Sequence, residues 1–227
     1  MRYSIDFINA RRAGRLRFSS QWLRRPGATL SPASSIDKTR VYKNLNEPDS
    51  DNNYVNIASY LTRTAKEQPY KRAVVYPAGR DKKGRIAYSH LTFLQLDQES
   101  DCLAHGLTAA GVASGTRTVL MVKPSLDFFA LIFALFKTGA IPVVVDPGMG
   151  IQRMVACFKS SRPEAFIGIP LAHVVRTVYP GFFKTVKTWI TVGRRWFWGG
   201  LTLAQLRKKP GVSFACIKTG REDTAAV

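Results

Sequence analysis

The 227-residue sequence has few of the residues that build disulfide and metal sites. It contains only three cysteines and three histidines. Cys102, Cys157 and Cys216 are far apart and odd in number, which argues against a disulfide framework and favours a reducing compartment. No two of the cysteines are at metal-ligand spacing. We therefore expect no metal site and a cytoplasmic location.

Common catalytic motifs are missing as well. The sequence has no GxxxxGK[ST] phosphate loop, no GxGxxG after a strand and no GxSxG nucleophile turn. The glycine pairs 148/150 and 199/200 are more typical of turns than of loops that bind phosphate. Taken alone, these observations predict a fold and no active site.

The remaining polar candidates have structural explanations. Asp97, Glu99 and Asp101 lie close in sequence, and we expect them on a solvated face of a helix rather than in a carboxylate dyad. His173 follows an apolar run and a proline, which favours a hydrogen-bonded structural histidine over a catalytic one. The predicted set of catalytic residues in this chain is therefore empty.

Long hydrophobic runs are absent. The longest covers nine residues, 128–136, and ends at Lys137. A membrane-spanning helix needs about 20 apolar residues. We interpret this run as a buried core helix followed by a buried strand, and expect no transmembrane span.

Acidic residues are scarce beside basic ones. The chain has 34 Lys and Arg against 15 Asp and Glu, a net charge of +19. A basic surface attracts polyanions. One explanation is a general excess of Lys and Arg on solvated faces, and another is a non-catalytic module that binds nucleic acid or anionic membrane. Zinc spacings, ribonucleoprotein motifs and basic zipper regions are missing, so we expect no nucleic-acid partner.

Residues 1–52 differ from the rest of the chain. Seven arginines and one aspartate occur in the first 25 residues, and Ser, Pro, Asn and Asp dominate 31–53. This composition superficially resembles a transit peptide, but it lacks the apolar core of a secretory signal. We interpret 1–52 as a flexible basic leader and 53–227 as a separate folded part.

Residues 118–147 are the most informative stretch for the fold. The runs 118–122 and 141–145 are short, apolar and rich in β-branched residues, as in strands covered on both faces. Between them Ser125 can cap a helix that carries Asp127 near its start, Lys137 at its end and Gly139 just beyond. This pattern predicts a right-handed parallel crossover.

The chain from residue 54 onward alternates between helical and strand patterns. We predict further strands at 73–76, 85–88, 165–169 and 189–192. We predict further helices from 54 to before Pro69, from an N-cap at Ser89 to Gly111, and at 151–158, 171–179 and 201–206. An aromatic loop, 196–200, precedes the last of these. The alternation predicts an α/β fold, a doubly wound sheet with flanking helices.

Three segments resemble one enzyme family. IAYSHL at 86–91 resembles the "(I/L)TYxEL" motif of adenylate-forming (AMP-binding, acyl-CoA synthetase-like) enzymes. Residues 111–119 resemble the family's "GV..GDRV" motif, with Thr116 in place of the usual acidic residue. Residues 135–147 are similar to its "xKxGAVxVPLDP" segment. The resemblance implies the N-terminal part of the large domain of that superfamily.

Four further segments narrow the resemblance. VKPS at 122–125, VVVDPG at 143–148, EAFIGIPLAH at 164–173 and TVGRR at 191–195 are similar to bacterial olefin β-lactone synthetases. The resemblance implies that ATP and Mg²⁺ activate a long-chain β-hydroxy acid as an acyl adenylate, which closes to a β-lactone. Other olefin-pathway enzymes are implied as partners. A long-chain acyl-CoA synthetase is the alternative.

The sequence departs from the family at its last residues. Residues 221–227 resemble the approach to the family's "TSGSTGxPKG" phosphate loop, and the sequence ends before that loop. We therefore expect a fragment that is catalytically inactive, with no catalytic, cofactor-binding or metal residue in this chain, and no binding of ATP and Mg²⁺. We also expect an uncovered sheet edge.

Overall fold

A computed structural model describes residues 56–146, 148, 150–207, 211–220 and 222–227. The chain divides into two units, Met1–Pro48 and Asp49–Val227. All described residues belong to the second unit. The leader predicted for 1–52 lies outside the described residues, as do Pro147 and Arg221.

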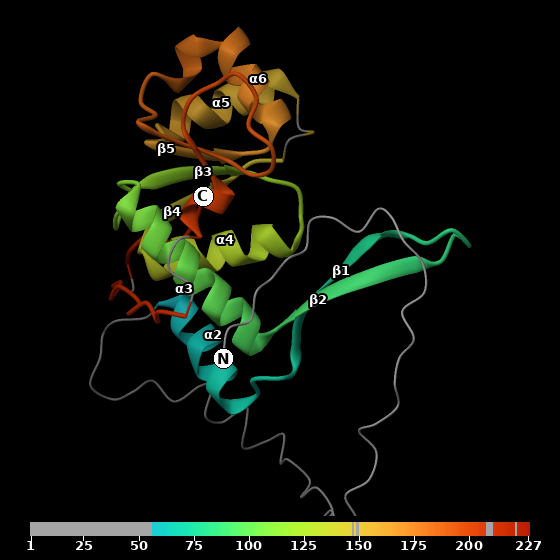
Figure 1. Cartoon of the computed structure of the whole chain (residues 1–227). Coiled ribbons are helices and arrows are strands. Elements are labelled where there is room, and N and C mark those ends of the chain that lie inside the picture. The colour runs from blue at the N-terminus through green and yellow to red at the C-terminus, as the bar shows by residue number, and fades with distance from the viewer. Residues whose placement is uncertain (1–55, 147, 149, 208–210, 221) are drawn as a thin grey trace, which may run out of the picture. The chain divides into compact units, whose positions relative to one another are not determined.

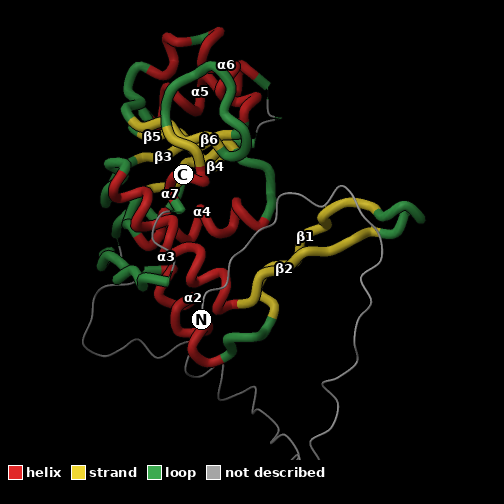
Figure 2. The backbone as a smooth tube through the Cα atoms, in the orientation of Figure 1, coloured by secondary structure: helices red, strands yellow, loops and turns green. Residues whose placement is uncertain are grey.

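The second unit is built on a five-stranded parallel sheet (Figures 1 and 2). Its strands follow the spatial order β4-β3-β5-β6-β7. Their bounds are β3 Arg117–Met121, β4 Ile141–Val144, β5 Ala165–Gly168, β6 Thr188–Thr191 and β7 Leu201–Thr202. Each neighbouring pair is parallel, so the carboxyl ends of all five strands meet at one edge.

The predicted crossover at 118–147 is confirmed. Helix α4, Leu126–Lys137, connects β3 to β4. Ser125 Oγ accepts a hydrogen bond from the Phe128 N–H at 3.2 Å, and Gly139 has φ +66° just after the helix. Ala130, Leu131, Ala134 and Leu135 are completely buried, so the apolar run is a core helix as predicted. Among the described residues no helix is long and apolar enough to cross a membrane.

Helices cover both faces of the sheet, which confirms the doubly wound fold. Helices α3 (Phe93–Ala109), α4 and α7 (Leu203–Leu206) lie on one face. Helices α5 (Ile151–Ser161) and α6 (Pro170–Val178) and the 3₁₀ turn η1 (Pro180–Phe183) lie on the other.

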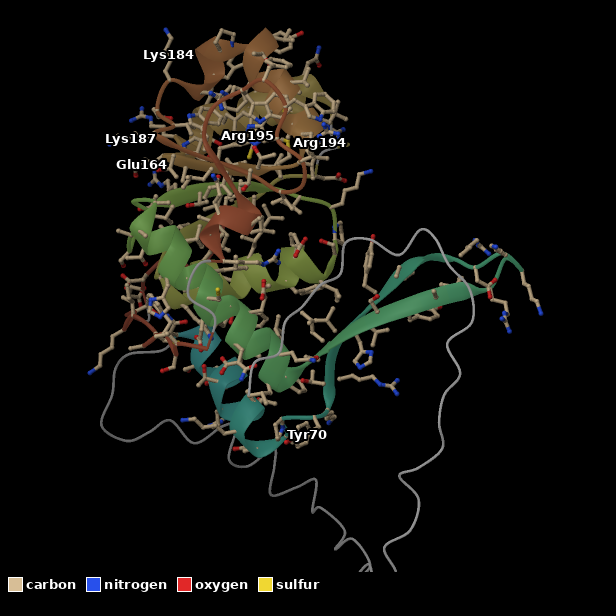
Figure 3. The ribbon with its side chains drawn as sticks, viewed as in Figure 1. Tyr70, Glu164, Lys184, Lys187, Arg194 and Arg195 are labelled. Carbon is tan, nitrogen blue, oxygen red and sulfur yellow. The ribbon has the colours of Figure 1, made fainter. Side chains whose placement is uncertain are left out.

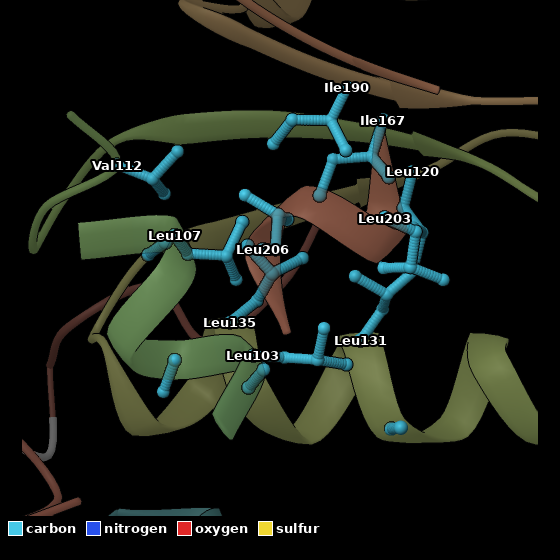
Figure 4. Close-up of a cluster of buried hydrophobic side chains, with 14 of the residues drawn as sticks. Leu103, Leu107, Val112, Leu120, Leu131, Leu135, Ile167, Ile190, Leu203 and Leu206 are labelled. Carbon is cyan, nitrogen blue, oxygen red and sulfur yellow. The ribbon is translucent and has the colours of Figure 1, made fainter. Parts of the chain in front are cut away.

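Alternate strand residues supply the two cores, because successive side chains point to opposite faces of a sheet. Leu120, Ile167 and Ile190 face the α3, α4 and α7 side (Figure 4). Val119 and Phe166 face the α5 and α6 side. Each of these five side chains is fully buried.

Helix α2 (Ile57–Glu67) and a β-hairpin precede α3. The hairpin strands, β1 (Arg72–Arg80) and β2 (Ile86–Thr92), are longer than predicted and form a separate two-stranded sheet. The predicted N-cap at Ser89 is wrong, since Ser89 lies inside β2 opposite Tyr76. Pairing of the hairpin continues to Thr92, and the helix begins only after it.

Thr92 is the actual N-cap of α3. Its Oγ1 accepts from the Gln95 N–H at 3.2 Å, and Gln95 Oε1 accepts from the Thr92 N–H at 3.0 Å. This is a capping box. The other end agrees with the prediction, because Gly111 follows the helix with φ +86°.

The end of the described chain differs from the sequence prediction in two ways. The helix predicted for 201–206 is divided, because Leu201–Thr202 pairs with β6 as β7 and α7 starts at Leu203. The outer edge of β4 is partly covered. The Val227 N–H donates to the Pro142 carbonyl at 3.0 Å, and the Val144 N–H donates to the Val227 carbonyl at 3.1 Å. These two bonds have the spacing of a parallel ladder.

Candidate functional site

The carboxyl edge of the sheet is where a doubly wound fold places ligands. The crossover from β3 runs through α4 on one face to β4, and the chain returns through α5 on the other face to β5. The first crossover moves from β3 to its neighbour β4, and the next returns past β3 to β5. This change of direction makes the carboxyl ends of β3 and β5 the topological switch point. The Ile169 N–H donates to the Met121 carbonyl at 3.1 Å and joins the two strands there.

Three polar residues follow these strand ends. Lys123 and Ser125 come after β3, and Asp146 comes after β4. Lys123 and Asp146 are exposed, while Ser125 is half-buried. Asp146 Oδ1 accepts from the Gly148 N–H at 2.8 Å, so this carboxylate fixes the turn that follows β4. The sequence prediction assigned Lys123 no role, although a lysine directly after a buried strand was a visible signal.

Of the polar candidates weighed from sequence, Asp97 and Asp101 were placed wrongly. They are not on a solvated face: the Lys137 amine lies 2.7 Å from Asp97 Oδ1 and 2.5 Å from Asp101 Oδ1. It also donates to the Asp97 carbonyl at 3.0 Å. The Lys137 side chain is 0% exposed, and those of Asp97 and Asp101 are 13% and 11% exposed.

This ion cluster of Lys137, Asp97 and Asp101 joins several segments. Thr62 of α2 donates from Oγ1 to Asp97 Oδ1 at 2.9 Å. Cys216 lies beside the cluster, and burial raises the pKa of its thiol above the ordinary value. The cluster has the architecture of a structural tie, since both carboxylates pair with the Lys137 amine and join α3 to α4.

Glu99 also differs from the solvated carboxylate that was expected. Its Oε1 pairs with the Arg207 Nε at the end of α7, and Arg207 Nη2 lies 2.6 Å from Asp127 Oδ1 of α4. Burial by itself would lower the pKa of Arg207, but Glu99 and Asp127 outweigh it and raise the pKa above its ordinary value. One guanidinium therefore connects three helices on the same face of the sheet.

His173 is buried and hydrogen-bonded, as predicted. It is completely buried on α6, and its Nε2 lies 3.1 Å from the Ile190 carbonyl and 3.2 Å from Thr191 Oγ1. Trp198 stacks on the imidazole, with ring centroids 5.3 Å apart and planes 10° apart. Burial lowers the pKa of His173, and the charge of Arg176 adds to that effect.

Both glycine pairs weighed from sequence lie in turns. The Gly148 N–H donates to the Asp146 carboxylate, and Gly150 has φ +84° before α5. Gly200 has φ +105°, and a Cβ there would lie 2.7 Å from the Trp189 carbonyl oxygen. The close approach of the two backbones accounts for this glycine without a ligand.

Comparison with known proteins identifies the family. The family model described as "AMP-binding enzyme" matches residues 61–191, more than half of the chain. This span runs from α2 to the end of β6 and contains the carboxyl ends of β3, β4 and β5. The chain belongs to the AMP-binding enzyme family.

Two relatives of this AMP-binding chain are olefin beta-lactone synthetases. The protein of Stenotrophomonas maltophilia is 46% identical over 177 residues, which cover 76% of this chain and 32% of the relative. The protein of Xanthomonas campestris pv. campestris is 42% identical over 174 residues, which cover 76% of this chain and 31% of the relative. The chain thus spans about a third of the length of these curated relatives.

The fold of the AMP-binding chain is similar to that of a solved ligase. The crystal structure of the anthranilate CoA ligase AuaEII in complex with anthranoyl-AMP matches with a TM-score of 0.66 and 19% identity. The match covers 77% of this chain and 32% of the ligase. At this identity the likeness shows a shared fold, and it agrees with the predicted N-terminal part of an adenylate-forming domain.

AMP-binding family enzymes use ATP and Mg²⁺. Phosphates are held by several N–H donors or cations that converge on one point. At the carboxyl edge, the first turn of α4 is already occupied by its own cap, Ser125. Within the described ranges no three His, Cys, Asp or Glu side chains group to hold a metal ion.

Proposed function

We propose that this chain forms the N-terminal sheet of an ATP-dependent adenylate-forming ligase that acts on long-chain β-hydroxy acids. The observation that carries the proposal is the 42–46% identity to two olefin beta-lactone synthetases over 76% of the chain. In the proposed reaction the carboxylate attacks ATP and releases pyrophosphate. The β-hydroxyl oxygen then attacks the activated carbonyl, loses its proton and releases AMP, which leaves a β-lactone.

The proposed role of the present residues is to build the scaffold. The buried parallel strands and the capped helix α4 hold the carboxyl edge rigidly, and rigid elements position reacting groups better than loops do. We propose that none of the described residues is a catalytic, cofactor-binding or metal-binding group. The chain alone is then expected to release no pyrophosphate from ATP. This proposal rests on the ion cluster, Arg207 and His173 all being engaged internally.

The proposed setting is cytoplasmic, with other olefin-pathway enzymes as partners and no nucleic acid. The wide spacing of the three cysteines supports a reducing compartment. The thiols of Cys157 and Cys216 also have pKa values raised by burial, which disfavours the reactive thiolate form.

A chimera tests the function directly. Residues 54–227 of this chain replace the matching segment of the Stenotrophomonas maltophilia synthetase, and the folded chimera is given ATP, Mg²⁺ and a long-chain β-hydroxy acid. We expect pyrophosphate release and a β-lactone, detected by mass spectrometry, without added CoA. The same chimera without ATP is the control, and the chain by itself should be inactive.

Three results would contradict parts of this proposal. A folded chimera that activates no long-chain acid would show that the segment is unsuited to this chemistry. Formation of an acyl-CoA only when CoA is supplied would favour the long-chain acyl-CoA synthetase alternative. Turnover by residues 1–227 alone would overturn the scaffold role.

A further inference from the structure

Residues 193–198 display two large aromatic side chains to solvent. Trp196 is 57% exposed and Phe197 is 75% exposed. Arg194 and Arg195 precede them and are exposed as well (Figure 3). Exposed tryptophan and phenylalanine beside arginine are unusual enough on a folded surface to indicate contact with another molecule.

The loop that carries these side chains is held in place rather than loosely attached. Trp198 is buried, donates from Nε1 to Thr191 Oγ1 at 3.1 Å and stacks on His173. The Arg195 guanidinium donates to the Gly200 carbonyl across the loop. Trp196 and Phe197 pack against the Trp198 ring at centroid distances of 5.4 and 5.1 Å. Their exposure is therefore a fixed property of the fold.

Helix α6 also exposes apolar side chains. Leu171 and Val178 are 65% and 61% exposed. They lie seven residues apart and so share one side of the helix. The start of the 193–198 loop approaches the first residue of this helix, since a Cβ on Gly193 would lie 3.9 Å from Pro170 Cδ. We call Leu171, Val178, Trp196 and Phe197, with Arg194 and Arg195, the aromatic–basic face.

The chain segment that carries this face, residues 147–206, is strongly cationic. Residues 147–206 contain eight Lys and Arg, seven of them exposed, against one acidic residue, Glu164. Residues 54–146 contain eleven Lys and Arg against seven Asp and Glu. Lys184 and Lys187 precede β6 and Arg194 follows it, so the two lysines lie apart from Arg194, and Glu164 lies beside Lys187 (Figure 3). The positive charge is thus concentrated on the α5 and α6 side.

The β1–β2 hairpin lies away from the aromatic–basic face. The hairpin β1–β2 is a two-stranded sheet, and such ribbons are only marginally stable alone. It contacts α3 and α4, on the opposite side of the parallel sheet from α6.

We propose that the aromatic–basic face docks on an anionic lipid surface. Trp and Phe enter the interfacial region of a membrane, and flanking Arg and Lys bind acidic headgroups. Single-stranded nucleic acid also binds aromatic and basic side chains, but it stacks on planar rings. Leu171 and Val178 are aliphatic, so they add affinity for lipid and offer no stacking surface. The interaction is independent of adenylate chemistry.

Vesicle sedimentation tests the proposal with the whole chain and no ATP. We expect binding to phosphatidylcholine vesicles that contain phosphatidylglycerol, weaker binding at high salt, and little binding to phosphatidylcholine alone. The double variant Trp196→Ser/Phe197→Ser should lose binding, and Arg194→Gln should weaken it about fivefold. Tyr70→Ser and Lys82→Gln change an exposed aromatic and an exposed lysine on other elements, and should bind as the original chain does.

A local probe separates this face from the basic residues 1–52. Bromine-labelled lipids should quench the tryptophan fluorescence of the bound chain, and Trp196→Phe should remove most of that quenching. Phe197→Ser is the milder variant if the double variant fails to fold by circular dichroism.

Several results would overturn the proposal. Vesicle binding that all variants retain, without quenching at Trp196, would place the contact elsewhere. Absence of binding to acidic vesicles would exclude the lipid surface. Binding of a single-stranded oligonucleotide through Trp196 and Arg194, with no vesicle binding, would assign the face to nucleic acid.

Discussion

The amine of Lys137 and the carboxylate of Asp101 are 2.5 Å apart, on helices that belong to different parts of the sequence. The lysine side chain is fully buried and the aspartate nearly so. A buried charge is tolerated only when its partners satisfy it. Asp97 supplies the second carboxylate, and the packing of α3 on α4 therefore depends on one lysine.

Lys137→Met should destabilise the chain by about 3–5 kcal/mol, because it leaves two nearly buried carboxylates without a counter-charge. Chemical denaturation measures the change. Lys123→Met, an exposed lysine after β3, is the matched control and should change stability by less than about 0.5 kcal/mol. Equal effects of the two substitutions would show that the ion cluster is not formed in solution.

Thr92→Ala should cost about 1 kcal/mol, because it removes the side chain that caps α3. Ser89→Ala removes the hydroxyl three residues earlier, inside β2, and should cost less than about 0.5 kcal/mol. Thermal or urea unfolding of the two variants compares them directly. A larger effect at Ser89 would contradict a helix that starts after Thr92.

Gly106→Ala should destabilise the chain by about 1–3 kcal/mol despite the better helix propensity of alanine. A Cβ on Gly106 would lie 2.4 Å from the Leu206 carbonyl oxygen, so α3 and α7 would have to move apart. Gly181→Ala is the control, since a Cβ there meets nothing within 4 Å. The midpoints of urea unfolding compare the stability of the two variants. A Gly106→Ala variant that is more stable than the original chain would contradict the close approach of α3 and α7.

His173 should make stability fall as the pH drops below its ordinary pKa of 6.5. Burial lowers its pKa in the folded chain, so the unfolded chain takes up a proton that the folded chain does not. The difference is absent well above 6.5, where both states are neutral, and it grows as the pH falls towards the folded pKa.

Melting temperatures between pH 7.5 and pH 5 measure this dependence. The variant His173→Gln should flatten the slope, although it is less stable at every pH. His90→Gln, which replaces an exposed histidine on β2, is the matched control. A slope that survives in His173→Gln would assign the titration to another group.

The sequence predicted those parts of the fold whose signals are local. The β3–α4–β4 crossover was found because the cap Ser125, the terminal Gly139 and two β-branched runs all agree over 30 residues. The helix start at Ser89 was wrong because strand pairing with β1, a contact between distant residues, extends β2 to Thr92. Local propensity does not include pairing between strands that are distant in sequence.

The polar network could not be predicted for the same reason. Asp97 and Asp101 have a partner that is 36–40 residues away on another helix. Nothing in the periodicity of α3 distinguishes them from solvated carboxylates. The functional family was accessible from short motifs. The aromatic–basic face needed the structure, because Gly193 and Pro170 come together only when the 193–198 loop and α6 are folded.

The segment 213–217 contacts helices α3 and α4, although it is far from both in sequence. Phe214 packs edge-on against His105 at 5.0 Å, and the Ile217 N–H donates to the Lys137 carbonyl at 2.9 Å. The Asn56 side-chain amide donates to the Ile217 carbonyl at 2.8 Å and to the Phe136 carbonyl at 2.8 Å. Chain ends usually exchange their amide hydrogens quickly. The Ile217 amide should instead exchange slowly and open together with the end of α4, as one cooperative unit.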